Sequence, residues 1–139
     1  MQAQIKWRGA AQFEGKSGSG HTVLMDGPPE HEGQNQGPRP MEMLLLGMGG
    51  CTAFDVVMIL KKSRQAVVDC EVEIEAQRAE TEPKVFTHIH IHFIVKGKAL
   101  KDKQVARAVQ LSAEKYCSAS IMFSKTATVT HDYEIVEQE

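Results

Sequence analysis

Alternating apolar and polar residues open the chain. In residues 2–7, Ala3, Ile5 and Trp7 fall on one side and the polar residues on the other. A period of two is typical of a strand with one buried face. Residues 9–13 and 21–26 predict two further strands, with a flexible turn over residues 15–20. Residues 27–40 hold four of the five prolines and predict a surface loop.

A long apolar segment follows from residue 41 to about residue 63, with Pro40 suited to the first turn of a helix. Almost every position before Lys61 is apolar, so the polar stripe of a surface helix is missing. Such a helix must be covered on all sides. In a chain of this size, that predicts either a fully central helix or a helix at a dimer interface.

The alternation returns in residues 69–77 and 85–95, which predict a long antiparallel hairpin closed by a turn over residues 78–84. Asp102 is a candidate N-cap for a helix that runs to about Tyr116. The short apolar piece 121–123 and a last strand over residues 126–136 complete the pattern. Strands and helices in this order predict an α+β fold.

Length and composition fit one globular domain, residues 1–139. Charged residues make up 24% of the chain and the formal net charge is −2, which argues against a general nucleic-acid binder or an anionic-membrane binder. We expect no signal peptide, because the first residues hold no apolar run. The uncharged apolar stretch 43–54 is shorter than the roughly 20 residues of a membrane span, so we expect a cytoplasmic protein.

Three cysteines are too few, and odd in number, for a secreted disulfide framework. Cys70 belongs to the apolar face of its strand, where a cysteine packs as a small hydrophobic residue. Cys51 follows two glycines, which leave space beside its sulfur for a substrate or a second chain; the alternative is a packed core residue. Asp55 lies one helical turn further on and, if ionised, opposes a thiolate at Cys51, so a cation is needed.

Cys117 follows the second predicted helix. A helix C-terminus carries partial negative charge and disfavours a thiolate. We therefore expect Cys117 to be the poorer nucleophile and the better candidate for a partner thiol. The alternative is a half-exposed cysteine with no chemical role.

Three histidines, His88, His90 and His92, share one face of the second hairpin strand. Imidazoles at this spacing can share a zinc or copper ion. The alternative is an ordinary polar strand face. Because the sequence offers no cysteine or carboxylate beside them at ligand spacing, we expect no metal here, and no cofactor elsewhere.

The two cysteine contexts, Gly-Gly-Cys51-Thr-Ala-Phe-Asp-Val and Tyr116-Cys117-Ser118, occur within this order of elements. Together they resemble the OsmC/Ohr family of bacterial thiol-dependent hydroperoxide reductases, in a divergent branch. The resemblance implies an intertwined α+β homodimer with antiparallel sheets around a buried central helix. It also implies that Cys51 attacks the peroxide and that Cys117 resolves the sulfenic acid to a disulfide.

The resemblance further implies a small organic hydroperoxide as substrate and an external dithiol of lipoyl type as reductant. Met41, Met48 and Phe54 are the expected apolar substrate contacts. The charged partners depart from the family pattern, because Met41 takes the place of the family's glutamate and Glu42 follows one residue later, about 100° around the helix. Lys16 stands in the glycine-rich turn where the family has arginine, so the candidate charged partners are as follows: Glu42, Arg39 and Lys16.

Two other functions remain open from the sequence. The first is a non-enzymatic protein of the same fold that binds a small hydrophobic ligand, or senses redox state, at the dimer cleft. The second, weaker alternative is a metal-binding protein that uses the histidine row.

Overall fold

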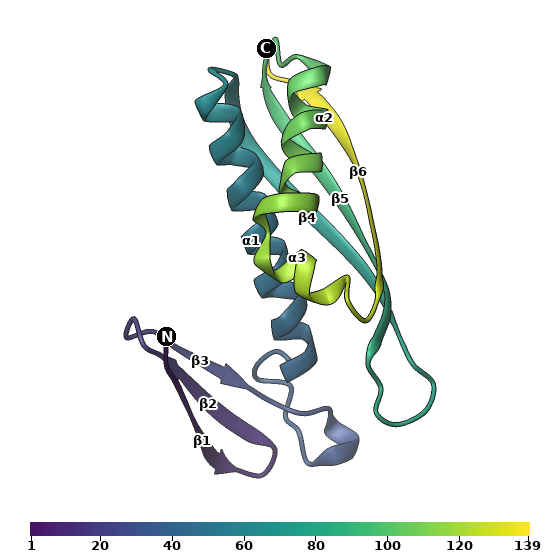
Figure 1. Cartoon of the computed structure of the whole chain (residues 1–139). Helices are drawn as coiled ribbons and strands as arrows, with labels where there is room; N and C mark the ends of the chain where they lie inside the picture. Colours follow the sequence, from purple (N-terminus) through teal and green to yellow (C-terminus); the bar gives the residue numbers. More distant parts are fainter. The chain divides into compact units, whose positions relative to one another are not determined.

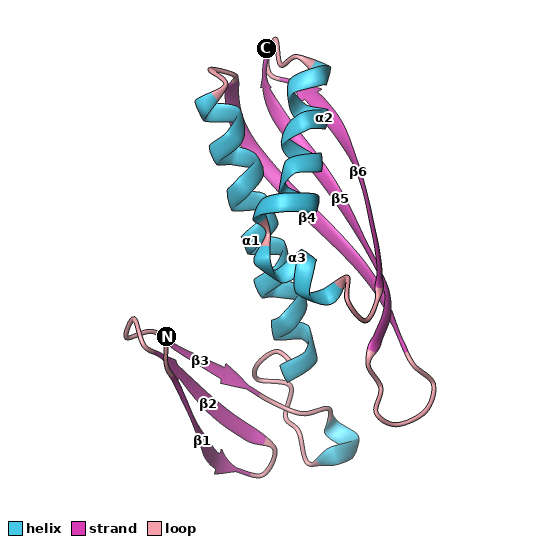
Figure 2. Cartoon of the chain, in the orientation of Figure 1, coloured by secondary structure: helices cyan, strands magenta, loops and turns pink.

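The computed structural model describes residues 1–139, which form six strands and three α-helices (Figures 1 and 2). The fold class is α+β, as predicted. The chain divides into two compact units, Met1–Leu46 and Gly47–Glu139, with the division inside the long helix α1. A single domain over the whole chain stays a prediction.

The first unit begins with an antiparallel sheet of β1 (Ala3–Gly9), β2 (Gln12–Ser17) and β3 (Thr22–Met25). The strand predicted over residues 9–13 is wrong, because the chain turns there: Gly9 and Ala10 both have positive φ. The second strand instead runs through the start of the predicted turn, where Gly15 pairs with Ile5 and Val23.

The proline-rich loop after β3 is held by one buried side chain. Asp26 is 1% exposed and accepts hydrogen bonds from the Gln12 side chain and from the backbone N–H groups of Gly27, Gln34 and Gln36. Burial alone raises the pKa of this carboxyl group, but the hydrogen bonds outweigh it and hold the pKa below 3.8. The loop is therefore an ordered structure around an ionised carboxylate.

Helix α1 (Pro40–Lys62) confirms the predicted long helix. Its buried residues recur every fourth position, as Met48, Thr52, Val56 and Leu60, which is the spacing of one helix face. In the single chain the helix is therefore covered on one side only.

By length and composition alone, α1 is long and apolar enough to cross a membrane. The expectation that the apolar segment is too short was wrong, because apolar residues continue beyond Asp55 to Leu60. The core helix of a soluble protein passes the same test.

The second unit contains a sheet in the order β4 (Ala66–Arg78), β5 (Phe86–Lys98) and β6 (Thr128–Glu137). The predicted hairpin is confirmed: β4 and β5 are antiparallel and Ile74 pairs with Ile91. The expectation of purely antiparallel sheets is wrong, because β6 runs parallel to β5. The helices between β5 and β6 form the crossover that a parallel pair requires.

This crossover contains α2 (Asp102–Leu111), a π-helical turn (Ser112–Tyr116) and α3 (Ser118–Phe123). The predicted N-cap is wrong: Lys101 precedes the helix, and the Asp102 carboxylate accepts a hydrogen bond from the Tyr133 hydroxyl. The core of the unit joins apolar residues of the helices to the inner face of β5; these residues are Val56, Leu60, Ile89, Ile91, Phe93, Val95, Val105, Ala108 and Val109.

Candidate functional site

Two cysteines and one carboxylate meet in the second unit. Cys51 and Asp55 lie one turn apart on α1, and Cys117 lies between the π-helical turn and α3. The two sulfur atoms and one carboxylate oxygen of Asp55 are all within 4.8 Å of one another. Both cysteines are free thiols; Cys51 is half-buried and Cys117 is fully buried. The structure thus brings together two thiols that are far apart in the sequence.

Cys117 is the C-cap of the π-helical turn that follows α2, as the sequence predicted, and it is also the N-cap of α3. Its Sγ accepts a hydrogen bond of 3.3 Å from the backbone N–H of Ser120. Burial raises the pKa of the Cys117 thiol above 9.0, hydrogen bonding from Ser120 partly offsets the rise, and the neighbouring Cys51 adds to it. The expectation of a poor nucleophile therefore agrees with the burial of Cys117 as well as with its place at the end of the π-helical turn.

A buried series of hydrogen bonds fixes the position of Asp55 beside the thiols. The Ser112 hydroxyl lies 2.7 Å from the Thr52 hydroxyl and 3.1 Å from Oδ2 of Asp55. Thr52 and Ser112 are at most 1% exposed. Since a carboxylate only accepts, Ser112 donates to Asp55 and Thr52 donates to Ser112. These hydrogen bonds join α1 to the π-helical turn beside the two sulfur atoms.

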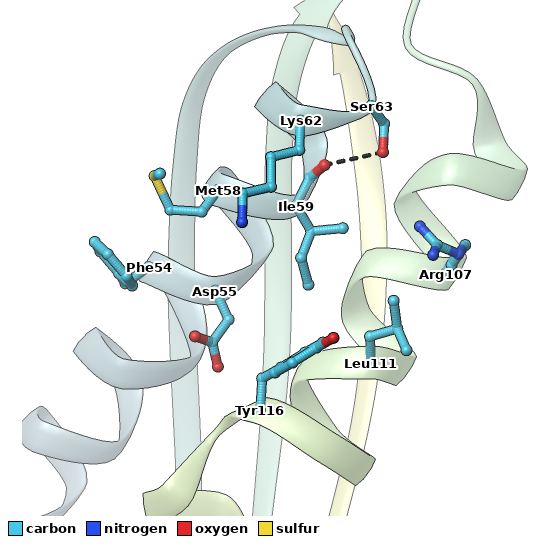
Figure 3. Close-up of a pocket in the computed structure, with 9 residues that line it drawn as sticks. All are labelled: Phe54, Asp55, Met58, Ile59, Lys62, Ser63, Arg107, Leu111 and Tyr116. Atoms are coloured by element: carbon cyan, nitrogen blue, oxygen red, sulfur yellow. Dashed lines mark hydrogen bonds between the residues drawn. The ribbon is translucent and has the colours of Figure 1, made fainter.

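Asp55 also lines a pocket of about 500 Å³ between α1 and α2 (Figure 3). Its walls are largely apolar, and two cations, Lys62 and Arg107, stand beside them. Asp55 is the one acidic residue of the wall, so the carboxylate belongs both to the pocket and to the thiol cluster. The lining residues are Phe54, Asp55, Met58, Ile59, Lys62, Ser63, Arg107, Leu111 and Tyr116.

Of the expected substrate contacts in this unit, Phe54 lines the pocket and is 66% exposed. Met48 is fully buried in the core stripe of α1 and is not part of this wall. Gly50, just before Cys51, has no atom within 4 Å of the position where a Cβ would lie, whereas at Gly49 a Cβ would meet Ile74 at 3.2 Å. Open space beside Cys51, which the sequence suggested, is therefore present at Gly50.

Met41 and the candidate charged partners belong to the first unit. The Glu42 carboxylate accepts a hydrogen bond of 2.8 Å from the backbone N–H of Arg39, which satisfies a donor at the start of α1. The Arg39 guanidinium binds the Asn35 side chain at 3.0 Å, and Lys16 lies in β2. Their partnership with Cys51 stays a prediction.

Sequence reasoning missed Ser112, Lys62, Arg107 and the side chain of Tyr116. For Ser112 a signal existed: it follows Val105 and Val109 at the spacing of one helix face. A hydroxyl on a buried stripe needs a partner. The two cations gave no such signal, because charged residues on helices usually face solvent.

The histidine row lies on the outer face of the second sheet, opposite the core. His90 and His92 both contact Oδ1 of Asp132, at 3.1 Å and 2.6 Å, and Glu134 lies 3.5 Å from His92. The expectation that no carboxylate lies near the row was wrong, because parallel pairing places β6 beside it. Hydrogen bonding to Asp132 is the largest contribution that raises the pKa of His92, and the same contact lowers the pKa of Asp132.

Comparisons with known proteins agree with this fold. A family model described as OsmC-like protein matches residues 33–132. The chain is 54% identical to protein YhfA of Escherichia coli K12, over 98% of both chains. A solved structure of a hypothetical protein from Aquifex aeolicus is 30% identical, with a TM-score of 0.87 over 99% of this chain and 97% of that one. The organic hydroperoxide resistance protein OhrB of Bacillus subtilis has the same fold, with a TM-score of 0.66 at 18% identity over 96% of this chain and 98% of that one.

Proposed function

The chain belongs to the OsmC-like protein family, which includes peroxide resistance proteins, and from this we propose that it is a thiol-dependent hydroperoxide reductase. Cys51 is the attacking thiol and Cys117 is the resolving thiol. One observation carries the proposal: two free thiols on separate elements have their sulfur atoms within 4.8 Å of each other.

The proposed catalytic cycle is complete without a cofactor. The Cys51 thiolate attacks the O–O bond of a hydroperoxide, and with one proton this gives a Cys51 sulfenic acid and an alcohol. The Cys117 thiol then attacks the sulfenic sulfur, and water leaves as the disulfide forms. An external dithiol reduces the disulfide, becomes a disulfide itself and returns both thiols.

The burial of the two cysteines supports this division of roles. Cys51 is half-buried beside the open space at Gly50, whereas Cys117 is fully buried. A peroxide reaches the more accessible sulfur first. The buried thiol then needs to meet only a sulfur atom already next to it, which is the task of a resolving cysteine.

The substrate is a small organic hydroperoxide, because the neighbouring pocket has apolar walls that include Phe54, Met58 and Leu111. The reductant is an external dithiol of lipoyl type. A cytoplasmic location, where thiols are kept reduced, fits this cycle. The family's charged partners, for which Glu42, Arg39 and Lys16 are the candidates, remain part of the proposal.

The active form in this proposal is a homodimer. On α1, Phe54 and Met58 are 66% and 38% exposed, although they belong to the most apolar helix of the chain. Exposed apolar residues on one helix face are typical of an interface. A second copy of the chain is the occupant we propose.

The pocket also favours a second candidate function. Its volume of about 500 Å³ falls within the range of small-molecule sites. A non-enzymatic protein that binds a small hydrophobic ligand or senses redox state needs only this pocket and a reversible thiol pair. Peroxide consumption separates the two functions.

The test mixes reduced protein with an equimolar amount of cumene hydroperoxide and counts thiols by mass spectrometry. We expect rapid loss of two thiols in a Cys51–Cys117 disulfide. C117S should stop at the sulfenic acid, and C70S, the matched control, should behave as the parent does. If C51S consumes peroxide as fast as the parent, or if the parent consumes none, the enzymatic function is excluded.

A further inference from the structure

We propose that the reduced protein binds one zinc ion per chain through Cys51, Asp55 and Cys117. The proposal goes beyond the peroxidase function and does not rest on it. It starts from the three ligand atoms within 4.8 Å of one another, on side chains that are half-buried or buried. Two sulfurs and one oxygen form a donor set that suits zinc far better than magnesium or calcium, which prefer oxygen alone.

The distances require little movement. In a tetrahedral zinc site two sulfur ligands lie about 3.8 Å apart, given zinc–sulfur bonds of about 2.3 Å. The sulfurs of Cys51 and Cys117 are already within 4.8 Å, so a contraction of roughly 1 Å or less completes the pair. Cys51 and Asp55 are spaced four residues apart on α1, which places both on the same face of the helix.

Each ligand has a neighbour that orients it. The Ser112 hydroxyl donates to Oδ2 of Asp55 at 3.1 Å, which leaves the other carboxylate oxygen free. The Ser120 backbone N–H donates to the Cys117 sulfur at 3.3 Å, as a hydrogen bond to a bound thiolate does. Hydrogen bonds of this kind fix metal ligands and tune their affinity.

The pocket supplies access and room for a fourth ligand. Asp55 lies in its wall, so an ion and a water molecule can reach the carboxylate from solvent. The protein then supplies three ligands and water supplies the fourth. An exchangeable position of this kind favours reversible binding over a purely structural site.

Binding changes the protonation of the site. Zinc binds thiolates, so two thiol protons leave as the two zinc–sulfur bonds form. The two positive charges of the ion offset the two thiolate charges, so the thiolates form without a net gain of negative charge. A zinc-bound thiolate attacks a peroxide less readily, so zinc holds the same two thiols out of the redox cycle.

The test titrates metal-free, reduced protein with cobalt(II) as a coloured substitute for zinc, without oxygen or peroxide. We expect a sulfur-to-cobalt charge-transfer band that saturates at one ion per chain, and its loss on addition of zinc. C51S and C117S should abolish the band, D55N should weaken binding at least tenfold, and S112A should weaken it about tenfold. C70S is the matched control and should bind as the parent does.

A weakly buffered zinc titration provides an independent measurement, with two protons expected per ion. Circular dichroism of each variant checks that a loss of binding is not a loss of fold. A missing band in the parent, or a band that persists in C51S or is unchanged in D55N, overturns the proposal. Peroxide consumption by the metal-free protein is measured separately, so zinc binding without peroxidase activity, or the reverse, identifies which of the two proposals fails.

Discussion

The hydroxyl of Ser112 on the π-helical turn lies 3.1 Å from the carboxylate of Asp55 on α1. It joins two elements that the sequence separates by more than fifty residues. The carboxylate is in turn within 4.8 Å of the sulfur atoms of Cys51 and Cys117. This contact therefore sets the geometry between the two halves of the thiol pair.

Replacement of Ser112 by alanine should destabilise the protein by about 1–3 kcal/mol, because the Thr52 hydroxyl and the Asp55 carboxylate each lose a buried partner. Urea unfolding of S112A against the parent measures the loss. S118A is a matched control on an exposed serine and should differ from the parent by less than about 0.5 kcal/mol. Equal stability of S112A and S118A would show that the chain of hydroxyls contributes nothing.

Cys70 should react slowly at neutral pH. Burial raises its pKa to about 11, and the nearby Asp69 carboxylate adds to the rise. Since the thiolate is the form that reacts, alkylation of Cys70 should be negligible near neutral pH and should accelerate as the pH approaches 11. Iodoacetamide labelling followed by peptide mass spectrometry measures the alkylation rate of each cysteine separately. Rapid labelling of Cys70 at neutral pH would contradict its burial.

The His92–Asp132 contact should stabilise the fold within a limited pH range. The pKa of Asp132 is lowered from 3.8, so its contribution is present above that value and is lost as the pH falls through the lowered pKa. The pKa of His92 is raised from 6.5, so its contribution is complete below that value and is lost as the pH rises through the raised pKa. Other nearby charges act in the same directions: Glu73 and Glu134 also raise the pKa of His92, and His90 also lowers the pKa of Asp132.

D132N should therefore lower the urea midpoint most at about pH 5, between the two ordinary pKa values, and less at about pH 2.5 and about pH 9. D69N removes a strand carboxylate that has no histidine partner and serves as the control. The same loss for D132N at all three pH values would rule out a contribution from ionisation.

Two glycines should respond oppositely to alanine. A Cβ at Gly97 would lie 2.3 Å from the Ala66 carbonyl oxygen, so G97A should cost about 1–3 kcal/mol through strain between β5 and β4. Gly50 faces open space in the single chain, and alanine is favoured in a helix by about 1 kcal/mol. G50A should therefore leave monomer stability equal or higher. Thermal unfolding of both variants checks the contrast. If G97A is as stable as the parent, the close approach of the β4 backbone to Gly97 is contradicted.

Leu60 is fully buried at the end of the α1 stripe. L60A should cost about 2–5 kcal/mol through lost contacts and a cavity. F54A, on the exposed side of the same helix, should cost much less in the monomer but should weaken self-association. Sedimentation velocity combined with urea unfolding separates the two effects. If F54A lowers monomer stability as much as L60A does, the one-sided burial of α1 is wrong.

The sequence predicted elements whose patterns are local. The alternation of Val72 and Ile74 with glutamates identified β4, and the unbroken apolar run identified α1. Turns were less predictable. The chain turns at Ala10, which has positive φ, and the pattern of apolar residues carries no information about this backbone conformation.

The site was predictable only in part. The two cysteines stood out by context, but the meeting of Asp55 with Ser112 depends on a crossover that no local pattern encodes. The same holds for Asp132, which reaches His90 and His92 only because β6 is parallel to β5. Long-range pairing of this kind is decided by the packing of helices on the sheet and not by the residues of either strand alone.

The parallel pairing of β6 with β5 also sets the order in which the chain can fold. The β4–β5 hairpin and α1 are available early, whereas β6 can pair only after the whole α2–α3 crossover has been made. Such non-local pairing is slow relative to hairpin formation. Cys117 lies inside that crossover, so it can meet Cys51 only once the crossover has packed against α1. The two thiols therefore stay apart through the early, local steps of folding and meet only when this non-local contact forms.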